Sequence, residues 1–107
     1  MSKVPKRYFR VKEEFPDVIE SYEKMGEAVH EAGPLDPKTR ALIKLAVSTG
    51  ARFEGAVHAH ARKALKAGCT PEEMRHAAML SLPTIGLPSM MAALQWVDDI
   101  IEGKPKK

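Results

Sequence analysis

The stretch from Arg52 to Thr70 constrains the fold of this 107-residue chain more than any other part of it. Small and apolar residues recur there at helical spacing and predict a helix from about Phe53 to Ala67. One stripe of this helix comprises Phe53, Ala56, Val57, His60, Ala61, Ala64 and Leu65. His60 is the only strongly polar member of the stripe. Because a polar group facing a helical core needs a partner or a purpose, His60 becomes the first candidate for function.

Proline and glycine residues divide the rest of the chain into further helices. Thr70 and Glu73 around Pro71 form the sequence pattern of a capping box, and Asp36 before Pro37 is a typical helix start. No alternating run predicts a strand. We therefore expect an all-α fold with one helical domain over residues 13–103, a charged N-terminal arm over 1–12 without periodicity, and a basic tail over 104–107. About five helices are expected, near residues 16–32, 36–50, 53–67, 70–82 and 89–102.

The charge and cysteine content narrow the possible function classes. The net charge of +3 is small and arises mostly at the two ends, so we expect a solvated surface and no nucleic-acid partner. Cys69 is the only cysteine, which excludes an intrachain disulfide and fits a reducing cytoplasm. Neither a signal-peptide pattern nor an apolar run of membrane-spanning length occurs in the sequence, so we expect no membrane association.

Three ordered segments carry a resemblance to a known family. They are residues 35–43 (LDPKTRALI), residues 54–73 with Glu54, His60 and Gly68, and the turn Gly86-Leu87-Pro88. Together they resemble the carboxymuconolactone decarboxylase and alkylhydroperoxidase D-like family from Leu35 to about Ile101. The resemblance implies an all-α alkylhydroperoxidase D-like helical domain that forms a homo-trimer or homo-hexamer. A short chain with apolar residues on more than one helix face also favours self-association.

The chain departs from the redox branch of that family. This branch carries a Cys-x-x-Cys pair and a glutamate proton relay, and the corresponding positions here are Phe53, Ala56 and Ala41. That branch also uses a histidine, and of its four functional residues only this one remains here, as His60. Peroxide reduction by that route needs a nucleophilic thiolate and a resolving thiol on one helical face. The aromatic residue followed by Glu54, and the histidine at position 60, resemble the thiol-free decarboxylase branch more closely.

The resemblance assigns candidate roles to four residues. His60 and Glu54 are the catalytic candidates, and Arg40 and Phe53 are the candidates for substrate binding. Each has a structural alternative: His60 as a core histidine, Glu54 as an exposed helix pair with His58, and Arg40 as an ion-pair partner of Asp36. No cofactor and no metal are expected. His58 and His60 point about 200° apart on one helix and cannot bind the same ion within a chain.

Three functions remain open on the sequence. The first is cofactor-free decarboxylase-type acid–base chemistry by His60 on a small carboxylate, which is lyase chemistry. The second is a peroxiredoxin-type antioxidant activity, against which the missing cysteine pair argues. The third is a non-catalytic oligomer that binds a ligand or a partner protein. We further expect His60 to be buried or to line a cavity, with His58 more exposed in the row of Glu54 and Arg62.

Overall fold

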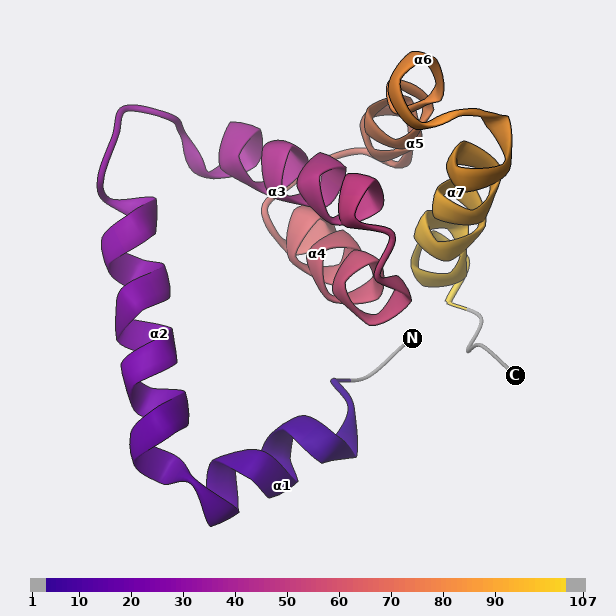
Figure 1. Ribbon diagram of the computed structural model, residues 1–107. Coiled ribbons are helices and arrows are strands. Elements are labelled where there is room, and N and C mark those ends of the chain that lie inside the picture. The colour runs from indigo at the N-terminus through magenta and orange to yellow at the C-terminus, as the bar shows by residue number, and fades with distance from the viewer. Residues whose placement is uncertain (1–3, 104–107) are drawn as a thin grey trace. The chain divides into compact units, whose positions relative to one another are not determined.

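The computed structural model describes residues 4–103, which form helices connected by short turns (Figure 1). No strand occurs within these residues, and the expected all-α class is confirmed. Residues 1–3 and the predicted basic tail at 104–107 lie outside the described residues. None of the described helices is both long and apolar enough to cross a membrane. The helices are α1 (Lys6–Glu14), α2 (Pro16–His30), α3 (Pro37–Ala51), α4 (Glu54–Lys66), α5 (Pro71–Met79), α6 (Leu82–Ile85) and α7 (Leu87–Ile101).

Contacts within the chain define two compact units, one up to Leu35 and one from Asp36 onward. The sequence did not predict this boundary. The first unit contains α1 and α2, and the expectation of an arm without periodic structure is therefore wrong for Lys6–Glu14. Tyr8 donates a hydrogen bond to Glu23, and Lys12 lies 3.5 Å from the same carboxylate. These contacts join residues 15 and 11 positions apart, which local sequence spacing does not reveal.

One face of α2, together with Phe15 just before the helix, carries a row of apolar side chains that remain exposed. They recur at alternating intervals of three and four residues, which is the spacing of a coiled-coil seam. Each side chain is more than half exposed. We call this row the α2 stripe, and it comprises Phe15, Val18, Tyr22, Met25 and Val29.

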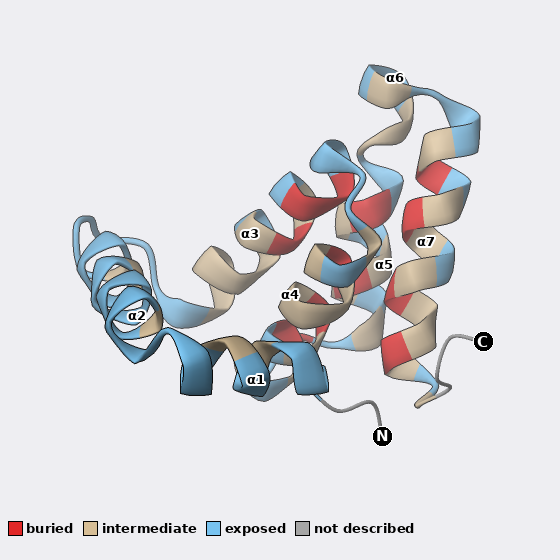
Figure 2. Ribbon diagram, turned by 60° about the horizontal axis from the view of Figure 1, so that its bottom comes forward, coloured by how far each residue is buried: buried red, intermediate tan, exposed pale blue. Residues whose placement is uncertain are grey.

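The second unit holds the hydrophobic core. Helix α4 packs against α3 and α7, and α5 packs against the same two helices. Figure 2 shows the buried residues on α3, α4, α5 and α7, with none on α1 or α2. Several core positions are alanines, which allow the helix backbones to approach closely. The core residues are Leu45, Val57, Ala61, Ala64, Cys69, Met74, Ala78, Val97 and Ile100.

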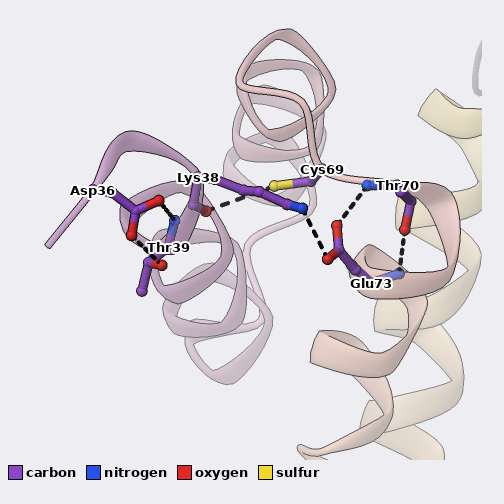
Figure 3. A network of polar contacts seen from close by, with 6 residues as sticks. All are labelled: Asp36, Lys38, Thr39, Cys69, Thr70 and Glu73. Carbon is purple, nitrogen blue, oxygen red and sulfur yellow. Dashed lines mark hydrogen bonds and ion pairs between the residues drawn. The ribbon is translucent and has the colours of Figure 1, made fainter.

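The predicted start of α5 is confirmed in atomic detail. The Thr70 hydroxyl accepts a hydrogen bond from the backbone N–H of Glu73 at 3.1 Å, and the Glu73 carboxylate accepts one from the N–H of Thr70 at 2.8 Å. Glu73 also lies 3.0 Å from the ammonium of Lys38, at the start of α3 (Figure 3). The capping box thus fixes the beginning of α5 and joins it to α3.

Two details differ from the expected helices. The segment between Pro83 and Pro88 was expected to be a connector, but its first part belongs to the short helix α6. Phe53 was expected on the core stripe, but it precedes α4 and is 68% exposed. The helical periodicity starts one residue later than expected, so the buried face of α4 is built on Val57, Ala61 and Ala64.

Candidate functional site

His60 lies on α4 and is partly buried. Burial lowers the pKa of its imidazole first, and the positive charges of Lys63 and Lys44 lower it further. Lys63 belongs to α4 and Lys44 to α3, so the ring lies in a positive field produced by two helices. Its pKa is therefore below the ordinary value of about 6.5, and the ring is neutral at pH 7.

Lys44 lies on α3 and interacts electrostatically with both His60 and Arg40. Burial lowers the pKa of the Lys44 ammonium first, followed by the positive charges of Lys63 and Arg40. Arg40 precedes Lys44 by one helical turn, and its Nε atom is buried. We call Arg40, Lys44, His60 and Lys63 the cationic cluster. Positive groups gathered in this way form a field that stabilises a bound anion.

A second group of titratable side chains lies on another face of α4. His58 Nε2 lies 3.0 Å from Asp99 Oδ2 on α7, and both side chains are about 15% exposed. One ligand atom each of Glu54, His58 and Asp99 lies within 4.8 Å of the others. The expectation that His58 belongs to a solvent-facing row is therefore wrong. The row of Glu54, His58 and Arg62 faces α7 at its centre, because His58 contacts Asp99 of α7.

The structure separates the two catalytic candidates. Glu54 precedes His60 by six residues in the same helix, which places the two side chains about 120° apart around its axis. Glu54 belongs to the group with His58 and Asp99, whereas His60 belongs to the cationic cluster. Arg40 is electrostatically linked to His60 through Lys44. Phe53 is exposed at the start of α4. A joint acid–base role for Glu54 and His60 within one chain is not supported by this arrangement.

The sequence reasoning missed Lys44, Lys63 and Asp99. A weak signal for the lysines was present, because Lys44 follows Arg40 by four residues and Lys63 follows His60 by three. Residues at these intervals share one face of a helix. The interval of 41 residues between His58 and Asp99 offered no comparable local signal, since it depends on the packing of α4 against α7.

Cys69 occupies a core position. The thiol is 4% exposed and donates a weak hydrogen bond to the Lys38 carbonyl at 3.6 Å (Figure 3). Burial raises the pKa of this thiol first, and the Glu73 carboxylate raises it further, against the lowering effect of the Lys38 ammonium. Because the thiolate is the reactive form, a raised pKa and burial both make this cysteine a poor nucleophile.

The lowered pKa of His60 makes stability depend on pH in a definite direction. The unfolded chain, with an imidazole pKa of about 6.5, takes up the proton before the folded protein does. The free energy of unfolding should therefore fall as the pH drops through 6.5 and stop falling, for this group, below the folded-state pKa. Urea denaturation at pH 7.5 and about pH 5 should show a smaller loss in His60→Gln than in the wild type. An equal loss in both proteins would contradict the buried, cation-flanked imidazole.

Comparisons with known proteins identify the class. A profile of the carboxymuconolactone decarboxylase family matches residues 16–99, and the chain belongs to this family. The match runs from the start of α2 to Asp99 in α7 and includes both groups described above. The family resemblance expected from the sequence is thereby confirmed.

Two relatives show how far the similarity extends. An uncharacterized protein of Haemophilus influenzae is 38% identical over 63 residues, which cover 59% of this chain and 56% of that protein. The chain thus spans little more than half the length of that relative. An uncharacterized protein of Methanocaldococcus jannaschii is 29% identical over 91 residues, which cover 84% of this chain and 88% of that protein. No solved structure matches the chain.

Proposed function

We propose that this protein uses His60 for acid–base chemistry on a small cyclic or unsaturated carboxylate, in a decarboxylase-type reaction without a cofactor. One observation carries the proposal: burial first, and neighbouring cations second, lower the pKa of both His60 and Lys44. Arg40, Lys44 and His60 are partly buried and Lys63 is exposed, and a bound anion offsets the repulsion among the cations. A carboxylate is the anion that the family name suggests, and the thiol-free helix α4 fits acid–base chemistry better than redox chemistry.

Binding of a carboxylate would change the protonation of His60. In the free protein, burial and then the charges of Lys63 and Lys44 lower the imidazole pKa and favour the neutral ring. A carboxylate seated among Arg40, Lys44 and Lys63 would neutralise part of their charge and add a negative charge beside the ring. Both effects raise the imidazole pKa. The substrate itself thus drives the uptake of the proton from water that His60 later transfers.

The reaction follows from this charge arrangement. The bond between the substrate carbon and its departing carboxylate breaks, carbon dioxide leaves, and the electron pair remains on the substrate as an enolate. The positive charges of the cationic cluster stabilise the developing negative charge. Protonated His60 then gives its proton to carbon and returns to the neutral form. The balance is one carboxylate and one proton converted to one carbon dioxide and one carbon–hydrogen bond.

Binding of muconolactone, a product-like lactone carboxylate, provides the test. Calorimetry should show that Lys44→Gln weakens binding at least about tenfold, because a charge-assisted contact contributes about 1.5–3 kcal/mol. The matched control is Lys66→Gln, which removes an exposed lysine from the same helix as Lys63. This variant should bind as the wild type does. His60→Gln should retain binding but lose release of carbon dioxide from γ-carboxymuconolactone.

Two results would refute the proposal. The first is an equal loss of affinity in Lys44→Gln and Lys66→Gln, which would indicate nonspecific attraction to a basic surface. The second is an undiminished release of carbon dioxide by His60→Gln, which would place the proton donor elsewhere.

Thiol peroxidase activity is the alternative that the wider family suggests, and we expect it to be absent. Phe53 and Ala56 occupy the positions of the working cysteines, and Cys69 has a buried thiol with a raised pKa. Hydrogen peroxide should therefore not be consumed faster with the protein and dithiothreitol than with dithiothreitol alone. Turnover that disappears in Cys69→Ser would contradict this expectation and establish a one-cysteine mechanism.

We further propose that copies of this chain assemble with each other as a homo-trimer or homo-hexamer. Proteins of this family are often oligomeric. The α2 stripe supports self-association, because five large apolar side chains on one helix face are each more than half exposed. An exposed apolar row with coiled-coil spacing fits a second α2 helix better than it fits water.

We also propose that the protein functions in the reducing cytoplasm, because its single cysteine cannot form an intrachain disulfide.

A further inference from the structure

The group of Glu54, His58 and Asp99 has no role in the proposed decarboxylation. It lies on the side of α4 that faces α7, and its member Glu54 is about 120° around the helix axis from His60. All three side chains are partly buried, and their nearest ligand atoms lie within 4.8 Å of one another. Two carboxylates and an imidazole brought together from two helices are a set of metal-binding groups.

The spacing of the atoms fits a metal ion. Metal–nitrogen and metal–oxygen bonds of about 2.1 Å place neighbouring ligand atoms of a tetrahedral Zn²⁺ ion about 3.4 Å apart. His58 Nε2 and Asp99 Oδ2 are already 3.0 Å apart. All three ligand atoms lie within 4.8 Å of one another, so a side-chain adjustment of about 1 Å brings them to tetrahedral spacing.

A neighbouring residue orients one of these carboxylates. The Gln95 side-chain amide donates a hydrogen bond to Asp99 Oδ1 at 3.1 Å, one helical turn before it on α7. This contact occupies one oxygen of the carboxylate and leaves Oδ2 directed at His58. Such outer contacts are how proteins orient metal-binding side chains.

We propose that Glu54, His58 and Asp99 bind a divalent transition-metal ion such as Zn²⁺. The two carboxylates neutralise the charge of the ion, and the imidazole favours a transition metal over Mg²⁺ or Ca²⁺. His58 would bind the ion through the lone pair of Nε2, with the ring proton on Nδ1, and the ion would replace the contact of Nε2 with Asp99. Three protein ligands leave the remaining positions of the ion to water or to a ligand. The site would join α4 to α7 and is independent of the cationic cluster.

Zinc titration of the intact protein tests this site. The protein is first treated with a chelator and then titrated with ZnCl₂ by calorimetry, while the imidazole nitrogens are followed by NMR. We expect the His58 signals to shift before those of His76, which is an exposed histidine on α5. His58→Gln and Asp99→Asn should each weaken zinc binding at least about tenfold. His76→Gln and His60→Gln should bind zinc as the wild type does.

The outcome is decisive even if a ligand variant fails to fold. The NMR titration of the wild type needs no substitution, and zinc that first perturbs His76 or His60 would overturn the proposal. Zinc affinity that is equal in the wild type and in a folded Asp99→Asn variant would also overturn it. Loss of zinc binding leaves muconolactone binding to the cationic cluster unaffected, so the two proposals fail separately.

Discussion

Replacing Met74 with alanine should lower the free energy of unfolding by about 2–5 kcal/mol. Met74 is fully buried in a core where many neighbours are alanines, among them Ala61, Ala64 and Ala78. Small neighbours fixed on rigid helices cannot move in to fill the space that the methionine leaves. Since domains of this size are stable by about 5–15 kcal/mol, the variant should approach the limit of folding.

Met79→Ala is the matched control, because Met79 is 41% exposed at the end of the same helix. This substitution should change the free energy of unfolding by less than about 1 kcal/mol. Urea denaturation followed by circular dichroism measures both variants. Similar losses in the two variants would contradict the position of α5 in the core.

The native mass should be about three or six times the chain mass of 11.8 kDa. Light scattering at micromolar concentration measures this directly. The double variant Tyr22→Glu with Met25→Glu places two negative charges in the α2 stripe, where the wild type exposes apolar side chains. We expect this variant to be a folded monomer, because burying unpaired charges at an interface costs several kcal/mol.

Glu20→Gln serves as the control for this experiment, because it changes an exposed charged residue of α2 outside the stripe. It should leave the mass unchanged. A wild-type mass near 11.8 kDa would exclude the proposed assembly. A double variant that keeps the full mass would show that another surface holds the copies together.

The helical fold could be read from local signals. Asp36 and Thr70 mark the starts of α3 and α5 because their side chains cap the following helix, and such caps depend on residues only three positions away. The helix α1 escaped prediction, since its attachment to α2 depends on Glu23, which is 15 residues from Tyr8. Phe53 was misplaced because an apolar residue just before a helix fits the helical stripe by spacing alone.

The candidate site could be predicted only in part. The motif pointed to His60 and Arg40, but it also joined Glu54 to His60, and the helix geometry separates them. Spacing along one helix assigned His58 to solvent, because it contains no information about which side α7 covers. Contacts between helices far apart in the sequence arise from packing. The spacing of residues along one chain does not reveal them.

The pH titration of the His60 imidazole by NMR tests the central claim most directly. In the free protein its pKa should lie below the ordinary value of about 6.5, and Lys44→Gln should raise it, because Lys44 is one of the cations that lower it. In the wild type, addition of muconolactone should raise the imidazole pKa above its value in the free protein. An imidazole that titrates at or above 6.5 in the free protein and responds to neither change would contradict a carboxylate site built around His60.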